Sequence, residues 1–368
     1  MKKELFRNQI LAIKPYVPGK PVEEVERELG ISNAIKLASN ENPLGPSPLA
    51  VEAMAKTISK VSAYPDGNCY YLKNALSEHL GVTPGHLIVG NGSDEILKLI
   101  TEAFLNEGEE AVVADPSFSE YDFSVKIMGG TTVAVPLTDY THDLKAMRAA
   151  VTEKTKLVFV CNPNNPTGTT VGRKQVTELI DSLPEGVITI LDEAYYEYVA
   201  DPEYPESIDF IHQGKNVIVL RTFSKIYGLA GLRIGYGVAN PELIGSLMRV
   251  KEPFNVNMMA QVAALAALED KEHVARSREL NEEEKIFLAG EFTRLGLFHV
   301  PTQANFIWLR VAADCRSVFN ALLKRGVIVR TGDIFGAPDV VRVTIGTREQ
   351  NKRFIMMLEE VLTTEGVL

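Results

Sequence analysis

Seven short apolar runs in the middle of the chain limit the fold more than any other feature. They are rich in β-branched residues and lie at 87–89, 111–114, 132–135, 157–160, 187–191, 217–220 and 234–238. Amphipathic stretches such as 94–104 and 173–182 lie between several of them. This alternation predicts an α/β fold with a mostly parallel seven-stranded sheet between helices. Ligands of such sheets bind at the carboxyl ends of the strands, so the residues that follow each run are the candidates for function.

The pattern changes after residue 240, where helix-like stretches dominate. The expected elements are helices at 241–250, 258–268, 315–325 and from 348 onward, and strands at 304–309, 327–330 and 340–345. The N-terminal segment contributes a helix at 22–29 and a strand at 35–38. We interpret the charge run at 269–285 as the solvated face of a helix. The expected division is an N-terminal segment (1–45) that packs with the small domain, a large domain (46–268) and a smaller α+β domain (269–368).

Composition argues against several classes of function. The formal net charge is −10, which argues against nucleic acid or an anionic membrane as the main partner. No apolar run approaches the roughly 20 residues that span a bilayer, and the N-terminus lacks the apolar stretch of a secretory signal. Cys69, Cys161 and Cys315 lie far apart and the six histidines are scattered, so we expect neither a disulfide framework nor a metal site. These features predict a protein of the reducing cytoplasm.

A glycine-rich turn follows the first apolar run. It reads Gly-Asn-Gly-Ser-Asp-Glu and leads into a helix-like stretch. The backbone N–H groups of Gly92, Ser93 and Asp94 could hold a phosphate at the helix N-terminus. The turn also resembles part of a dinucleotide fingerprint, with Asp115 after the next run, although Glu95 stands where the third glycine belongs. An oxidoreductase that uses a nicotinamide cofactor (NAD) is therefore an alternative.

Two later strand ends carry side chains that suit a heteroaromatic ligand. Asn165 lies between Pro163 and Pro166, which restrict the direction of its side chain, so it could donate a hydrogen bond to a ligand oxygen. Asp192 directly follows an apolar run, where a carboxylate is costly without a cationic partner. Facing a protonated pyridine nitrogen, Asp192 would keep that nitrogen charged and the ring an electron sink. A plain turn at the asparagine and a helix-capping aspartate are the structural alternatives.

Lys225 lies just beyond the run at 217–220, in a loop of small and hydroxyl-bearing residues with an arginine at each end. In an uncharged pocket beside a strand end its amine would have a lowered pKa, which suits a lysine that forms a Schiff base. A solvent-exposed loop lysine is the alternative. Together with the phosphate turn, the aromatic Phe118, Asn165 and Asp192, this lysine completes the groups that pyridoxal 5'-phosphate needs.

The motifs around these residues resemble a known enzyme family. PNNPTG at 163–168, DEAY at 192–195 and SKxxGLAGLRxGY at 224–236 are similar to the fold-type I, aspartate-aminotransferase-like enzymes. Within that group, the motifs that resemble the histidinol-phosphate aminotransferase family are PYVPGKP at 15–21, SNENPLGPSP at 39–48, the YPDG turn at 64–67, GNGSDE at 90–95, DPSFSEY at 115–121 and RVTIGTRE at 342–349. The resemblance covers essentially the whole chain and implies a pyridoxal-phosphate-dependent transferase of fold type I.

The resemblance implies a role for each residue around the cofactor. Lys225 would hold pyridoxal phosphate through an imine and carry a proton between substrate and cofactor carbons. Asp192 would pair with the pyridine nitrogen, and Tyr195 and Asn165 would bond the phenolate oxygen of the ring. Phe118 would stack on the ring, although many relatives have Tyr or Trp here. The implied phosphate-binding residues are Ser93, Asp94, Ser224 and Arg233, with Tyr64 reaching across from the neighbouring subunit of a homodimer.

The resemblance also implies a substrate. The implied substrate-binding residues are Tyr16, Asn40, Arg330 and Arg342. Two guanidinium groups suit a phosphate dianion better than a single carboxylate. The implied reaction is reversible transfer of an amino group between L-histidinol phosphate and 2-oxoglutarate, giving imidazole acetol phosphate and glutamate, in L-histidine biosynthesis. Alternatives on the same site are an aromatic-amino-acid aminotransferase, an enzyme that serves both substrates, and a decarboxylase of a phosphorylated amino acid.

Overall fold

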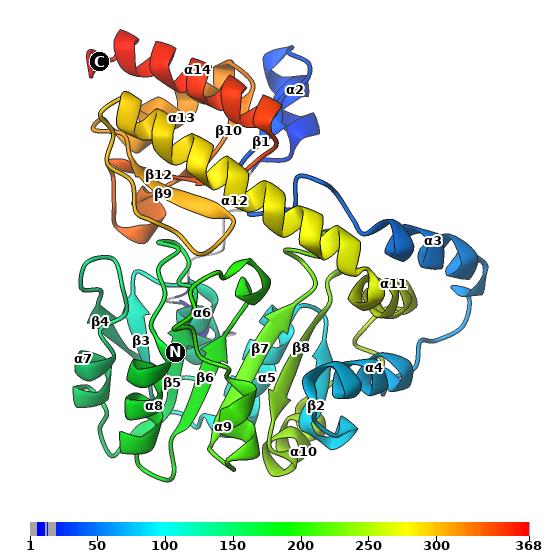
Figure 1. Ribbon diagram of the computed structural model, residues 1–368. Coiled ribbons are helices and arrows are strands. Elements are labelled where there is room, and N and C mark those ends of the chain that lie inside the picture. Colours follow the sequence, from blue (N-terminus) through cyan, green and yellow to red (C-terminus); the bar gives the residue numbers. More distant parts are fainter. Residues whose placement is uncertain (1–5, 12, 14–19, 368) are drawn as a thin grey trace.

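A seven-stranded sheet is the largest element of the computed structural model, which describes residues 6–11, 13 and 20–367 (Figure 1). Its strands are β2 (Leu87–Gly90), β3 (Glu110–Asp115), β4 (Thr131–Pro136), β5 (Thr155–Cys161), β6 (Ile188–Asp192), β7 (Val217–Thr222) and β8 (Gly235–Ala239). They follow the order β2-β8-β7-β6-β5-β3-β4 across the sheet. β8 is antiparallel to both of its neighbours, and the other neighbouring pairs are parallel. The predicted mostly parallel sheet is therefore confirmed.

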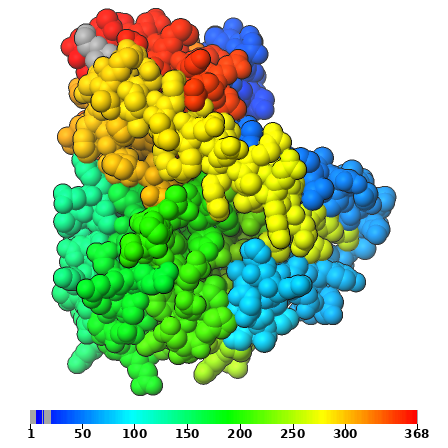
Figure 2. All heavy atoms as spheres, in the orientation of Figure 1, coloured from blue at the N-terminus to red at the C-terminus, as the bar shows by residue number. Residues whose placement is uncertain are grey.

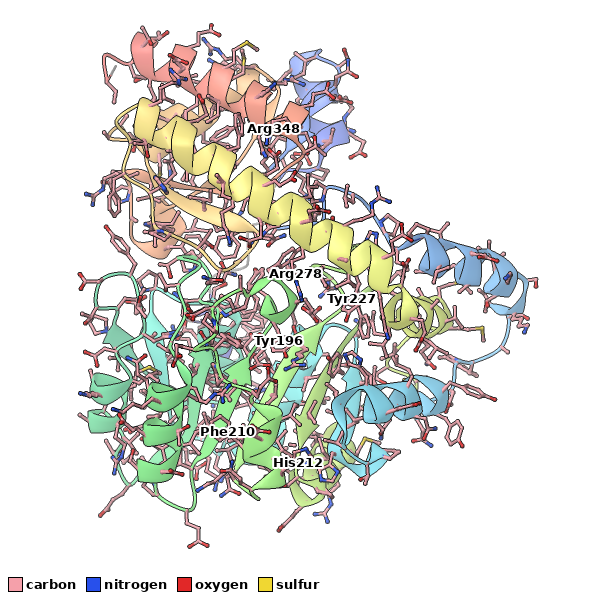
Figure 3. The ribbon with its side chains drawn as sticks, viewed as in Figure 1. Tyr196, Phe210, His212, Tyr227, Arg278 and Arg348 are labelled. Atoms are coloured by element: carbon pink, nitrogen blue, oxygen red, sulfur yellow. The ribbon has the colours of Figure 1, made fainter. Side chains whose placement is uncertain are left out.

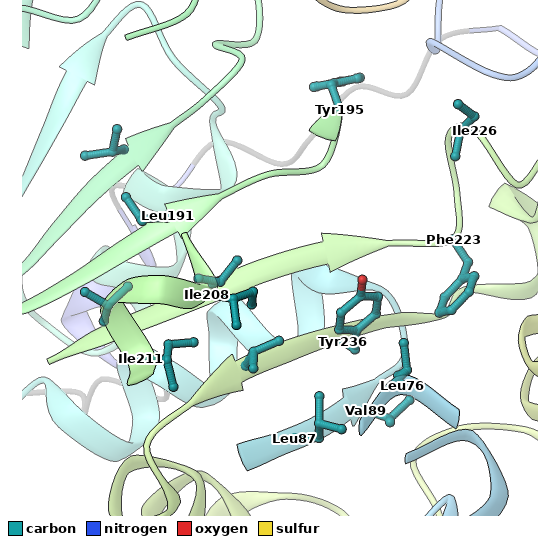
Figure 4. Close-up of a cluster of buried hydrophobic side chains, with 14 of the residues drawn as sticks. Leu76, Leu87, Val89, Leu191, Tyr195, Ile208, Ile211, Phe223, Ile226 and Tyr236 are labelled. Carbon is teal, nitrogen blue, oxygen red and sulfur yellow. The ribbon is translucent and has the colours of Figure 1, made fainter. Parts of the chain in front are cut away.

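Both faces of this sheet are buried, because successive residues of a strand point to opposite sides. In β5, Leu157 and Phe159 belong to one hydrophobic cluster, whereas Val158 and Val160 belong to the other. The first cluster is covered by α5 (Ser93–Phe104), α6 (Glu120–Ile127) and α10 (Pro241–Val250). The second is covered by α4 (Tyr70–Leu80), α7 (Leu144–Ala149), α8 (Arg173–Ser182), α9 (Ile208–His212) and α11 (Met258–Glu269), and Figure 4 shows part of it. Each fully buried aliphatic or phenyl side chain contributes roughly 1.5–3 kcal/mol of transfer free energy.

A smaller α+β part lies beside the large sheet, above it in Figure 1. Its strands are β9 (Phe306–Arg310), β10 (Val327–Ile328), β11 (Arg330–Thr331) and β12 (Val340–Thr344), and its helices are α12 (Lys271–Arg294), α13 (Cys315–Lys324) and α14 (Arg348–Thr364). β12 pairs antiparallel with both β9 and β11. Leu309, Val343 and Phe354 belong to a hydrophobic cluster separate from those of the large sheet. This part therefore has its own core.

The N-terminal segment contacts both parts of the molecule. Its first described helix, α1 (Asn8–Leu11), lies against α6 of the large part, and Arg7 Nη2 donates a hydrogen bond to the Ile127 carbonyl at 2.8 Å. The stretch from residue 22 to residue 38 packs on the smaller part. Its strand β1 (Ile35–Lys36) pairs in parallel with β10, and Val25 of α2 (Val22–Leu29) shares a small cluster with Ile328. Figure 2 shows the region of α2, in blue, beside the C-terminal helix, in red. The remaining helix of the described residues is α3 (Pro48–Thr57), with short 3-10 turns between several elements. The domain boundaries at residues 45 and 268 stay a prediction.

Two details differ from the sequence-based expectations. The strand expected at 327–330 is split, because β10 pairs with β1 and β11 pairs with β12 in a different sheet. The charge run at 269–285 is not wholly solvated, since Glu284 is 1% exposed and accepts a hydrogen bond from Arg348 Nε at 2.6 Å. Figure 3 shows Arg348 on α14, next to α12. No helix within the described residues is both long enough and apolar enough to cross a membrane.

Candidate active site

One cavity of about 410 Å³ gathers most of the predicted site residues. The predicted residues that line it are Asn40, Ser93, Asp94, Phe118, Asn165, Asp192, Tyr195, Ser224, Lys225, Arg233, Arg330 and Arg342. Those of the large part follow the carboxyl ends of β2, β3, β5, β6 and β7, because parallel strands bring these ends to one edge. The two arginines at 330 and 342 come from β11 and β12 of the smaller part. The cavity therefore lies between the two parts of the molecule.

Lys225 is held in a tight loop after β7. Its carbonyl accepts a hydrogen bond from Gly228 N–H at 3.0 Å, and its Nζ donates to the Ser39 carbonyl at 3.2 Å. Gly228 has a φ of +70°, and a Cβ there would lie 2.1 Å from the Gly45 carbonyl oxygen, so only glycine fits. Burial first, and the Arg342 guanidinium second, lower the pKa of Lys225 to about 8. A lysine in this setting can act as a nucleophile near neutral pH.

Asp192 ends β6 and is 3% exposed. Its Oδ2 accepts a hydrogen bond from Tyr121 OH at 2.7 Å, and its Oδ1 accepts one from Ala194 N at 3.2 Å. Burial raises the pKa of Asp192 to about 6, although the hydrogen bond from Tyr121 acts in the opposite direction. A buried carboxylate of this kind is suited to hold a protonated ring nitrogen.

Tyr121 is a functional candidate that the sequence did not single out. It is 1% exposed, and its ring stacks on Phe159 with centroids 4.8 Å apart. The Phe118 ring meets it edge-on at 5.6 Å. Tyr121 lies three positions after Phe118 at the start of α6, and no local pattern marks it as a partner of a residue 71 positions away.

The start of α5 is the predicted phosphate-binding corner of the cavity. Gly92 caps the helix with a φ of +82°, and a Cβ there would lie 2.5 Å from Arg233 Nη2. A Cβ at Gly235 would lie 2.6 Å from the Ser93 backbone nitrogen. Arg233 Nη2 donates to Asp94 Oδ2 at 3.0 Å, so the carboxylate at the corner is paired. The close packing and the N–H groups at the helix start fit a phosphate group.

Asn165 and Tyr195 are linked to residues of other segments. Asn165 Oδ1 accepts a hydrogen bond from Arg342 Nη1 at 2.5 Å, so its amide nitrogen remains the donor. Tyr195 OH accepts a hydrogen bond from Asn40 Nδ2 at 2.9 Å. Burial is the largest of several influences that raise the pKa of Tyr195, so this hydroxyl keeps its hydrogen.

Arg330 and Arg342 are directly opposite each other in the β11–β12 ladder, and so share one face of that sheet. Arg342 is 7% exposed and also donates to the Ala38 carbonyl at 2.8 Å. The rings of Phe306 and Phe335 lie 5.2 and 5.8 Å from its guanidinium carbon. These contacts hold the Arg342 guanidinium at the cavity wall, which Arg330 also lines.

Two predicted residues are not placed in the cavity. Tyr64 is 80% exposed, stacks on Phe254 at 4.7 Å and does not line the cavity. Tyr16 lies outside the described residues.

A further buried ion pair was not expected from the sequence: Arg221 Nε donates to Glu193 at 2.9 Å, and the Arg221 guanidinium lies 3.5 Å from the ring centroid of Tyr196.

Several known proteins are similar to this chain in sequence and in structure. Residues 32–358 match the family model described as aminotransferase class I and II. A histidinol-phosphate aminotransferase of Moorella thermoacetica is 59% identical, over 97% of this chain and 92% of its own, and one of Caldicellulosiruptor saccharolyticus is 48% identical, over 97% and 100%. The crystal structure of histidinol-phosphate aminotransferase from Sinorhizobium meliloti in complex with pyridoxal-5'-phosphate superposes with a TM-score of 0.91 at 28% identity, covering 99% of each chain. The chain therefore belongs to the class I and II aminotransferase family.

Proposed function

We propose that the chain is a pyridoxal-phosphate-dependent aminotransferase that moves an amino group reversibly between L-histidinol phosphate and 2-oxoglutarate. The products are imidazole acetol phosphate and glutamate, in L-histidine biosynthesis. The observation that carries the proposal is that two separate sets of residues suited to bind anions line one cavity. Ser93 and Arg233 belong to the large part, and Arg330 and Arg342 belong to the smaller part. A phosphorylated cofactor and a phosphorylated substrate would need one set each.

The residues around Lys225 suit this cofactor. Pyridoxal phosphate, when bound, supplies an aldehyde that condenses with amines and a ring that accepts the electron pair released at the substrate carbon. With a pKa of about 8, Lys225 is partly neutral near neutral pH and can attack an aldehyde. When a substrate amine takes its place, the Lys225 amine would be free to take the proton from the substrate carbon and to return it.

The other cavity residues orient the ring. Asp192, ionised against a ring nitrogen, would hold the cationic form that draws electrons. The Tyr195 hydroxyl and the Asn165 amide nitrogen would donate to the ring oxygen, and Phe118, which lines the cavity, would stack on the ring. Ser224, which is 7% exposed, would donate a hydrogen bond to the cofactor phosphate, and the Arg233 guanidinium would offset part of its charge.

The substrate end of the cavity favours a dianion. Arg330 and Arg342 share one face, and two guanidinium groups can grip three phosphate oxygens with charge-assisted hydrogen bonds. A broad aromatic aminotransferase would need only one of them for the carboxylate of a neutral amino acid. Turnover of L-histidinol phosphate and of phenylalanine, each with 2-oxoglutarate, separates the two activities. Absence of turnover with the phosphate ester would refute the first and leave the second.

We further propose that the active enzyme is a cytoplasmic homodimer in which Tyr64 completes the neighbouring phosphate site. Four aromatic side chains are 50–80% exposed. They are Tyr64 before α4, Tyr70 and Tyr71 at the start of α4, and Phe254 in the loop after α10. Exposed aromatic side chains in such numbers suit a partner surface. Light scattering should give about twice the chain mass of 40.5 kDa. Tyr64→Ala and Lys225→Ala chains, refolded together, should recover activity that neither has alone, and no recovery would contradict the shared site.

A further inference from the structure

Asn40 joins the large and small parts at one buried point. It is 1% exposed, with a φ of +56° in a region that asparagine tolerates better than most side chains. Its Nδ2 donates to Tyr195 OH, which follows β6 of the large sheet. Its carbonyl accepts a hydrogen bond from Asn305 Nδ2 at 3.0 Å, next to β9 of the smaller part. A residue whose side chain bonds one part and whose backbone carbonyl bonds the other is placed to couple them.

Thr344 determines which way the Asn40 amide points. The Thr344 hydroxyl accepts the Asn40 backbone N–H at 2.9 Å and lies 3.1 Å from Asn40 Oδ1, to which it donates. The Thr344 hydrogen finds its acceptor in Oδ1, so Oδ1 lies toward Thr344 and Nδ2 lies toward Tyr195. Tyr195 therefore receives a hydrogen from Asn40 and keeps its own hydrogen for another acceptor.

Tyr195 lines the cavity, so its hydroxyl hydrogen can point into the cavity. Its ring meets Phe306 edge-on at 5.1 Å, and it lines the cavity beside Lys225, whose Nζ lies 5.8 Å from the ring centroid. The titratable and charged groups that act on the hydroxyl are Arg342, Cys161 and Asp192. Burial keeps the hydroxyl protonated, while Arg342 and the Asn40 hydrogen bond favour its ionised form. The Arg342 guanidinium and the Asn40 hydrogen bond therefore make the Tyr195 hydroxyl a stronger hydrogen-bond donor.

We propose that Asn40 is a positioning residue, which aims the Tyr195 hydroxyl hydrogen at the ring oxygen of the bound cofactor. A donor held against that oxygen reduces its basicity and so lowers the pKa of the lysine-bound cofactor. The inference rests on the proposed cofactor, and it gives Asn40 a role besides the substrate contact implied by resemblance. It makes the protonation of the cofactor depend on a contact between the two parts of the molecule.

Asn40→Gly tests the inference, because glycine accepts the positive φ and removes the amide without adding charge. The absorbance of the purified holoenzyme is titrated from pH 5 to pH 10. We expect the pKa of the visible band to rise by about one unit, which is what one net hydrogen bond represents. Thr344→Val provides a second route, because it frees the amide to rotate while Asn40 stays in place, and should shift the same pKa in the same direction.

Two comparisons separate positioning from a merely structural effect. Asn305→Ala removes a hydrogen bond to the same loop without touching the amide, so it should lower the melting temperature and leave the pKa within about 0.2 units. In a Tyr195→Phe background, Asn40→Gly should give little further shift, because the hydroxyl is already absent.

The outcomes distinguish this inference from the proposed function. A protein that shows no visible band and is not inactivated by borohydride would overturn the proposed cofactor itself. A visible band whose pKa is the same in Asn40→Gly and in the parent would overturn only the role of Asn40. A shift that persists undiminished in the Tyr195→Phe background, or one that Asn305→Ala reproduces, would overturn it as well.

Discussion

Replacing Tyr121 with Phe should raise the pKa of Asp192 and destabilise the protein by an amount that depends on pH. The change removes the hydroxyl that donates to Asp192 Oδ2 at 2.7 Å and leaves the ring stacked on Phe159. A hydrogen bond to a buried carboxylate is worth about 1.5–3 kcal/mol, whereas the same bond to a neutral carboxyl is worth about 1 kcal/mol. The difference corresponds to a further rise of about one unit in the pKa of Asp192, above its present value of about 6.

The direction of this pH dependence follows from the linkage between proton binding and folding. Asp192 has a folded-state pKa above its ordinary value of 3.8, so its contribution to stability is present at low pH and is lost as the pH rises toward about 6. In Tyr121→Phe that loss should continue to higher pH. Urea unfolding of the apoenzyme should therefore show a larger destabilisation at pH 8 than at pH 5, by about 1–2 kcal/mol.

Tyr204→Phe is the matched control. Tyr204 is also buried, but its hydroxyl donates to the Asn162 carbonyl, which does not titrate. Its loss should cost about the same at both pH values. Equal destabilisation of Tyr121→Phe at pH 5 and pH 8, or the same pH dependence in Tyr204→Phe, would refute the assignment of Tyr121 to the charge of Asp192.

Three further predictions concern the cavity. Arg330→Gln should lower kcat/KM for the phosphate ester roughly 10- to 100-fold and that for phenylalanine much less, because it removes one charge-assisted contact to the dianion; equal losses in steady-state assays would contradict a phosphate site. The rate of cofactor incorporation into the apoenzyme, followed by absorbance, should rise with pH through about 8 as the Lys225 amine loses its proton, and a flat profile would count against a neutral nucleophile. Gly235→Ala should weaken cofactor binding in titrations of the apoenzyme at least 10-fold, because the Cβ would lie 2.6 Å from Ser93 N, whereas Gly245→Ala, which meets nothing within 4 Å, should not.

Local pattern was enough to predict the large sheet and the residues at its strand ends. Each strand is buried on both faces, so its sequence is a short β-branched run, as at 157–160 and 217–220. Residues that follow such runs, such as Asp192 and Lys225, meet at one edge whatever the order of the parallel strands. The chemistry of the cavity is therefore largely encoded in motifs of a few residues each.

Which distant residues contact one another depends on the tertiary structure and not on local sequence pattern. The run at 327–330 looks like one strand, but its two halves pair with β1 and β12, and only the second pairing places Arg330 opposite Arg342. The hydrogen bonds of Tyr121 to Asp192 and of Asn40 to Tyr195 join residues 71 and 155 positions apart. Local propensity carries no information on such pairings, because their free energy arises only when the sheet and the two hydrophobic cores bring distant segments together.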